Sequence, residues 1–314
     1  MAEQYLNKTG LSRLWSKIKS LITGNNEALL WDVIRLNVKG STGITLTTLP
    51  DSITEIPDNE FENLENVALT TLPSGLTKIG ASAFSNCPNV ALTEIPYSLT
   101  EIGASAFKNC ISLNLSNWQM GQIASIGDYA FQGASRININ SFNRNNMNIG
   151  QYAFSGANVS INNDLDVGNG TIGNYAFKNC TSIGEVYYIT AGIIGAGAFE
   201  GCTNLAISEY YGKEISATTI NNNAFKGCTS LTEIVIGSNV NALKSFNFPA
   251  GGAFYNCTGL TSVTFKGTPT TIGTKAFGKC TNLTDIYVPW AEGEVANAPF
   301  GATNATIHYN YTGV

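Results

Sequence analysis

The chain has 314 residues, of which 43% are hydrophobic and only 12% are charged, and its formal net charge is −5. This composition is too apolar for a disordered chain and lacks the basic surface of a nucleic-acid-binding protein. The sequence contains neither a secretory signal nor an apolar run of about 18 residues, which a membrane span would need. We therefore expect a protein that is made in the cytoplasm without a signal peptide.

Residues 1–38 are predicted to form an N-terminal amphipathic segment and linker. Thr9 can cap a helix that ends before Gly24, and the apolar residues between them recur at helical spacing. This helix either covers the first coil of the following domain or docks onto another molecule, and binding to a membrane surface is a third interpretation. The residues proposed for docking are Leu11, Leu14, Trp15 and Ile18.

Residues 39–314 are predicted to form a repeat domain with a terminal capping coil. A phenylalanine, most often in the motif A-F-x-x-C, recurs at intervals of 22 to 29 residues. Such a period indicates a solenoid in which neighbouring coils bury a continuous core. The phenylalanines that mark the coils are Phe61, Phe84, Phe107, Phe131, Phe154, Phe177, Phe199, Phe225, Phe254, Phe277 and Phe300.

Each repeat contains a β-like run and the A-F segment. LTEIVI (231–236) and LTDIYV (283–288) follow the L-x-x-L-x-L pattern of a leucine-rich repeat strand, whereas VALTTL (67–72) shifts one apolar position. Residues three apart share a helix face, so A-F-x-x-C is predicted to form one short helical turn. The predicted class is an α/β repeat of about eleven coils, with short parallel strands and an N-terminal helix.

Seven cysteines each follow a repeat phenylalanine by three residues, and Ala134 and Ala157 replace the cysteine in two coils. Exchange with alanine favours a ladder of small buried thiols. Cysteines of neighbouring coils would lie roughly 5 Å apart, so disulfides remain an alternative. The sequence has no C-x-x-C motif, and we predict no metal site and no cofactor.

No catalytic constellation is apparent. His308 is the only histidine, no nucleophile motif accompanies it, and it is interpreted as a structural or surface residue. Carboxylates such as Glu55 and Glu101 recur at repeat positions, which favours solvent-facing strand sites over an acid and base pair. We predict that the protein is not an enzyme.

The runs L-T-E-I, the motif I-G-x-x-A-F and closing segments such as GCTSL (227–231) resemble BspA-like leucine-rich repeat proteins over residues 44–300. This resemblance implies a right-handed solenoid with adhesive or partner-binding roles at microbial surfaces. Residues 5–19 and 286–311 resemble the ends of tail-associated structural proteins from phages and prophages of gut bacteria. A virion part needs no export signal, because it leaves the cell by lysis.

Two regions are predicted to bind a ligand. Outward strand positions of a solenoid line a shared surface, and the stretched repeat 206–223 is expected to form a loop on the binding side. Aromatic rings beside polar acceptors suit a sugar or a peptide. The predicted ligand-binding residues are Glu185, Tyr187, Tyr210, Tyr211, Glu233, Asp285 and Tyr287.

The predicted function is a non-enzymatic adhesion or receptor-binding module of a phage or prophage tail. Its partners would be a host cell-surface glycan or protein, and a second copy or a virion protein at the N-terminal helix. The alternatives are a bacterial interaction or scaffold protein, either an adhesin or an intracellular effector, and a glycan-active enzyme. The predicted location is the virion, or else the cytoplasm.

Overall fold

The computed structural model describes residues 34, 38–39, 45–142, 146–246 and 251–313. The chain divides into two compact units, residues 1–46 and 47–314. Within the first unit, the described part includes the buried helical residues Ile34 and Val38. The residues of the predicted docking helix, Leu11, Leu14, Trp15 and Ile18, lie outside the described residues.

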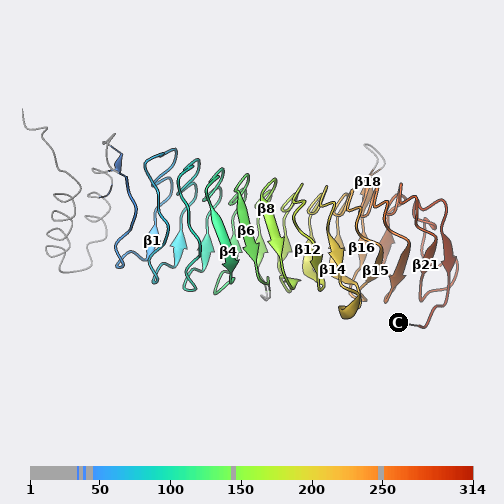
Figure 1. Cartoon of the computed structure of the whole chain (residues 1–314). Coiled ribbons are helices and arrows are strands. Elements are labelled where there is room, and N and C mark those ends of the chain that lie inside the picture. The colour runs from blue at the N-terminus through green and yellow to red at the C-terminus, as the bar shows by residue number, and fades with distance from the viewer. Residues whose placement is uncertain (1–33, 35–37, 40–44, 143–145, 247–250, 314) are drawn as a thin grey trace, which may run out of the picture. The chain divides into compact units, whose positions relative to one another are not determined.

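The second unit is a parallel β-solenoid of about eleven coils, and its largest sheet has fifteen strands. Along the sheet each coil places a strand beside that of the preceding coil, as Figure 1 shows. The strands of this sheet are β1 (Glu55–Ile56), β2 (Lys78–Ile79), β3 (Glu101–Ile102), β5 (Ser125–Ile126), β7 (Asn148–Ile149), β9 (Leu165–Asp166), β10 (Thr171–Ile172), β12 (Ile189–Ile194), β14 (Glu214–Ile220), β15 (Glu233–Ile236), β16 (Ala242–Leu243), β19 (Ser262–Phe265), β20 (Thr271–Ile272), β21 (Asp285–Tyr287) and β22 (Thr306–His308).

Three smaller sheets complete the described strands. The first is parallel and contains β4 (Asn114–Trp118), β6 (Arg136–Ile139) and β8 (Asn158–Ile161). The second pairs β11 (Glu185–Val186) with β13 (Ala206–Ile207), also in parallel. The third is an antiparallel pair of β17 (Ser245–Phe246) and β18 (Gly251–Gly252).

Strand register carries the sequence pattern from one coil to the next. Ile234 of β15 pairs with Val263 of β19, which in turn pairs with Ile286 of β21, and all three are buried. In each of these strands, the residues directly before and after the buried one face outward, because successive side chains of a strand point to opposite sides. The repeated L-x-x-L-x-L pattern therefore builds one apolar wall along the inside of the solenoid.

The repeat phenylalanines form a second buried wall. From Phe61 to Phe277, neighbouring rings stack with centroids 4.9 to 5.4 Å apart and planes within 18° of parallel. Stacked rings in a dry interior exclude water and hold the coils in register. In some coils a further ring packs against this stack, as Trp118 does on Phe131 and Phe142 on Phe154.

The cysteines are free and buried, which confirms the predicted thiol ladder. Each thiol donates a hydrogen bond, with a sulfur-to-oxygen distance of 2.8 to 3.2 Å, to the carbonyl of the phenylalanine one coil earlier. Cys87, for example, bonds to Phe61. The cysteines are thus structural links between coils.

The prediction of a helical turn in each A-F segment is wrong. Ser82 and Asn86, two residues before and after Phe84, have φ angles of 54° and 55°, which a right-handed helix does not allow. The amide of Phe84 donates to the carbonyl of Ala106 in the next coil at 2.8 Å, and not to a residue one helical turn back in its own coil. The A-F segment is therefore a stack of tight turns.

The predicted fold class is corrected accordingly. The solenoid of about eleven coils is confirmed, but the coils are all β, and the class is not α/β. Among the described residues, only Ile34, Val38 and the 3-10 turn η1 (Glu209–Tyr211) are helical. The predicted N-terminal helix is no part of the corrected class.

We expect the native thiols to resist modification. Burial raises the pKa of Cys87 to about 11 and that of Cys202 to about 12, so these two groups form almost no reactive thiolate near neutral pH. A hydrogen bond with Cys257 lowers the pKa of Cys280, but this thiol is buried like the others and a reagent cannot reach it. A disulfide-exchange reagent added at about pH 8 should react with none of the seven cysteines until denaturant is present, and then with all seven. Rapid reaction of several thiols in the native protein would contradict the buried ladder.

Candidate functional site

Three tyrosines meet where the turn between β13 and β14 lies beside the segment that joins β11 to β12. Tyr210 and Tyr211 belong to the 3-10 turn η1, and the ring of Tyr211 stacks on that of Tyr187 from the preceding coil, with centroids 4.2 Å apart. The Tyr210 ring meets Tyr211 edge-on at 5.0 Å. Tyr210 is 87% exposed and Tyr211 is 46% exposed. We call Tyr187, Tyr210 and Tyr211 the tyrosine cluster.

Backbone hydrogen bonds hold this turn in place. Gly212 has a φ of 82° and closes the turn by donating to the carbonyl of Glu209. The amide of Lys213 donates to the Ser208 carbonyl, and the amide of Ser208 donates to the Val186 carbonyl of the neighbouring coil. The exposed tyrosines are therefore presented by a defined turn that is tied to the sheet.

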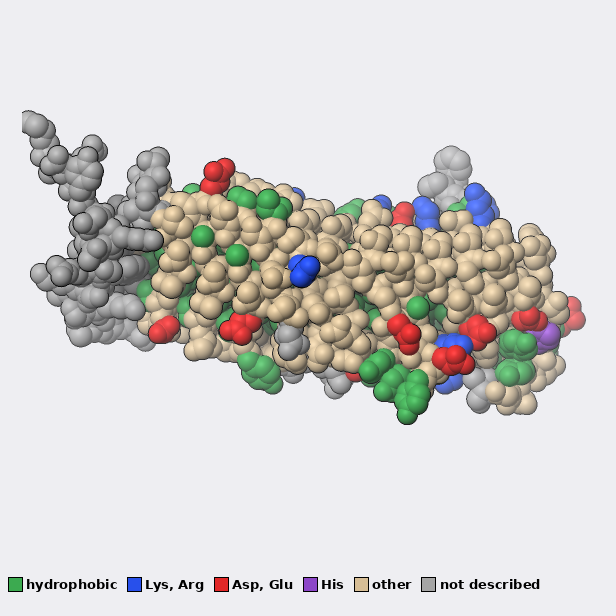
Figure 2. Space-filling model, viewed as in Figure 1, with side chains coloured by type: hydrophobic (Ala, Val, Ile, Leu, Met, Phe, Trp, Pro, Cys, Tyr) green, Lys and Arg blue, Asp and Glu red, His purple; other side chains and the backbone are tan. Residues whose placement is uncertain are grey.

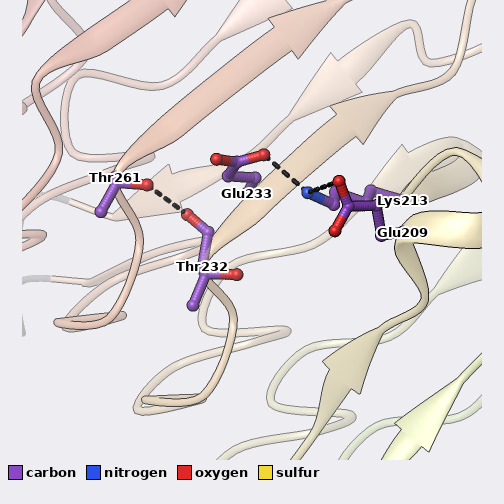
Figure 3. Close-up of polar contacts among 5 residues, drawn as sticks. All are labelled: Glu209, Lys213, Thr232, Glu233 and Thr261. Carbon is purple, nitrogen blue, oxygen red and sulfur yellow. Dashed lines mark hydrogen bonds and ion pairs between the residues drawn. The ribbon is translucent and has the colours of Figure 1, made fainter.

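The base of the turn carries an ion pair network, drawn in Figure 3. The Nζ atom of Lys213 lies 2.6 Å from a Glu233 carboxylate oxygen and 3.8 Å from one of Glu209. The Lys213 side chain is only 18% exposed, whereas that of Glu209 is 89% exposed. Lys213 therefore acts mainly as an anchor between coils, while the Glu209 carboxylate remains in solvent.

Two further carboxylates near the tyrosine cluster, those of Asp164 and Asp166, come from a preceding coil. Desolvation and the nearby Asp166 raise the pKa of Asp164 above its usual value. Desolvation and then the Asp164 charge likewise raise the pKa of the Tyr188 phenol. The pKa of Tyr211 is also raised, by desolvation, its tyrosine neighbours and Asp164. Asp164 contributes to the raised pKa of both Tyr188 and Tyr211, so at least one carboxylate lies near the tyrosine cluster.

A second aromatic group lies at the C-terminal end of the fifteen-stranded sheet. The ring of Tyr287 in β21 stacks on His308 in β22 at 4.5 Å and meets Tyr311 at 4.8 Å. Nε2 of His308 lies 2.7 Å from Oδ1 of Asp285, and Thr284 donates a hydrogen bond to the same carboxylate. We call Asp285, Tyr287, His308 and Tyr311 the terminal cluster.

The predicted ligand-binding residues thus fall into two groups. Tyr187, Tyr210 and Tyr211 meet, and Glu233 joins them through Lys213. Asp285 and Tyr287 instead belong to the terminal cluster. Glu185 is exposed in β11, two residues before Tyr187. Sequence reasoning missed five neighbours of these residues: Asp164, Glu209, Lys213, His308 and Tyr311. A signal for His308 existed, because it follows Asp285 by 23 residues, one coil period.

The described residues contain no group of three histidine, cysteine or acidic side chains that could hold a metal ion. In the same part of the chain, no helix is long and apolar enough to cross a membrane.

A surface cavity of about 400 Å³ lies at the bends of the coils around Tyr97 and Trp118. Figure 2 shows a hydrophobic patch, with acidic side chains beside it, at the edge where η1 projects in Figure 1.

Stacked coils with a repeated apolar strand pattern define a leucine-rich-repeat solenoid. Residues 39–160, 100–214, 159–250 and 193–307 match the BspA type Leucine rich repeat region, in six copies. The chain belongs to this family of BspA-type leucine-rich repeat proteins.

Solved structures with a similar course include three bacterial proteins. A leucine rich cell surface protein from Faecalibacterium prausnitzii A2-165 is 20% identical, with 89% of this chain and 86% of that chain covered and a TM-score of 0.40. A leucine-rich repeat protein from Bacteroides ovatus ATCC 8483 is 19% identical (84% and 77% covered, TM-score 0.32). The pneumococcal vaccine antigen PcpA is 18% identical (84% and 79% covered, TM-score 0.35). No curated protein matches the chain.

The terminal cluster predicts a pH-dependent contribution to stability. The hydrogen bond with His308, and then that from Thr284, hold the pKa of Asp285 below its usual value. The stabilisation is therefore present above the unfolded-state pKa of about 3.9 and is lost as pH falls through the folded-state pKa. Asp285→Asn should lower the free energy of unfolding near pH 6, and this difference from wild type should shrink as pH falls from about 3.9 through the lower folded-state pKa.

Denaturant titrations of both proteins across this pH range measure the effect. A difference between them that is the same at every pH would show that the Asp285 carboxylate does not contribute through its charge.

Proposed function

We propose that the chain is a non-enzymatic binding module whose ligand contacts the tyrosine cluster. The observation that carries this proposal is the 87% exposure of Tyr210 on a turn fixed by backbone hydrogen bonds. An exposed tyrosine adds little to folding, whereas covering it with a ligand removes a large ring from water at a small entropic cost. Rigid exposed aromatics of this kind are frequent hot spots of binding interfaces.

The ligand is a molecule of a host cell surface, and the module serves adhesion or receptor binding. The nearby carboxylates support binding more than catalysis, since Glu209 and Glu233 both approach Lys213 and do not flank a cleft as an acid and base pair would. The terminal cluster, at the end of the fifteen-stranded sheet, supplies a second aromatic contact for a long ligand.

Removing the exposed rings should weaken binding and leave the fold intact. The double variant Tyr210→Ala, Tyr211→Ala is expected to bind whole host cells about tenfold more weakly or worse, because two contact rings are lost. Tyr97→Ala is the matched control, since Tyr97 is 65% exposed and lies several coils away. Unchanged cell binding by the double variant, with unchanged thermal unfolding, would remove the tyrosine cluster as the binding site.

The chain is further proposed to be part of a phage or prophage tail. The support for this is the resemblance of residues 5–19 and 286–311 to the ends of tail-associated structural proteins. A tail location is compatible with adhesion, because a virion exposes its receptor-binding parts to the host surface after lysis.

Virion association can be tested directly. Particles induced from the host strain and purified by density gradient should contain the protein, and an antibody against the solenoid should label their tails. Recovery of the protein only from the cytoplasm or the bacterial surface would favour the alternative of a bacterial interaction protein or scaffold.

A further inference from the structure

We propose that the tyrosine cluster binds a cationic side chain, a lysine ammonium or an arginine guanidinium, carried by a basic segment of a protein partner. This inference rests on the proposed function and names the chemical class of its ligand. It is carried by the geometry of the three rings and by the charges of the residues around them.

The rings provide an accessible face for a cation. Tyr187 and Tyr211 cover one face of each other by stacking at 4.2 Å, whereas Tyr210 meets Tyr211 only at an edge and is almost fully exposed. The face of an aromatic ring carries partial negative charge and attracts a cation within about 6 Å of its centre. Tyr210 is therefore the ring best placed to receive an ammonium or guanidinium group.

The charges around the rings have the matching sign. Glu209 precedes Tyr210 in the chain and has an 89% exposed side chain, and Glu185 is exposed two residues before Tyr187. Asp164 and Asp166 add negative charge from the preceding coil, close enough to act on the pKa of Tyr188. A cation at the cluster would thus meet the exposed ring of Tyr210 and solvent-exposed carboxylates.

The lysine beside the cluster does not cancel this charge. Lys213 is only 18% exposed, and its ammonium lies 2.6 Å from Glu233, so its charge is already matched by that carboxylate. Its second contact, with Glu209 at 3.8 Å, is longer and leaves that carboxylate largely hydrated. An incoming cation can therefore pair with Glu209 without breaking the bond between Lys213 and Glu233.

This balance selects among ligand classes. An anionic polymer would be repelled by the same carboxylates, and a neutral sugar would stack on the rings without gaining from the charges. A basic segment gains both from the aromatic ring face and from the carboxylates. Its attraction to the surface carboxylates should weaken as salt shortens the screening length. A protein partner with exposed lysine or arginine therefore fits the site best.

The test uses the full chain and three short dye-labelled peptides. In the first, lysine alternates with glycine; in the other two, every lysine is replaced by glutamine or by glutamate. Fluorescence anisotropy at about 50 mM salt should detect binding of the lysine peptide alone, and about 500 mM salt should weaken it strongly. Tyr210→Ala should weaken it about two- to fivefold. The double variant Glu185→Gln, Glu209→Gln should weaken it about two- to tenfold.

The double variant Glu55→Gln, Glu94→Gln is the matched control, because both side chains are exposed several coils away and the net charge changes by the same two units. This control should bind the lysine peptide as wild type does. Equal binding of the glutamine peptide, or lysine-peptide binding that the double variant at Glu185 and Glu209 leaves unchanged, would overturn the inference. Host-cell binding that is lost in the tyrosine variants but kept in the double variant at Glu185 and Glu209 would overturn it too, while the proposed function would stand.

Discussion

The solenoid depends on one backbone hydrogen bond that recurs from coil to coil along most of its length. From Phe61 to Phe254, the amide of each repeat phenylalanine donates to an alanine carbonyl in the next coil at 2.7 to 2.8 Å. This bond sets the spacing of the coils at the A-F edge, as the strand ladder does on the sheet. The ring stack and the cysteine bonds both follow from it, because they join groups that the same spacing brings together.

The sequence contained enough information for the repeat, the strands and the buried side of each coil. Period and apolar spacing predict the walls of the solenoid because burial acts on the same positions in every coil. The turn geometry was harder to predict. From Phe61 to Phe225, the residues two before and two after each repeat phenylalanine have positive φ angles. Asparagine or glycine at many of these positions is a recognisable signal, but Tyr129, Tyr152 and Tyr175 adopt the same conformation without one.

The candidate site was predictable in part for a related reason. Broken periodicity identified Tyr210 and Tyr211, and alignment by one coil period would have placed Tyr187 and Tyr211 together. Alignment by the coil period could not predict the ion pairs of Lys213. This residue has a φ of 57°, and that backbone angle places its side chain next to Glu233. Side-chain pairs that bridge an irregular turn depend on local backbone angles, and these do not follow the repeat.

The same backbone constraint explains why the exposed tyrosines lie where they do. The interval from Phe199 to Phe225 is longer than most, yet the amide of Phe199 still reaches the next coil at 2.7 Å. Because the junction does not stretch, the extra residues must leave the stack, and they form the turn that presents Tyr210. An insertion can therefore create a binding surface without disturbing the core. Changes in the tyrosine cluster should alter recognition, whereas changes in the phenylalanine stack should alter stability.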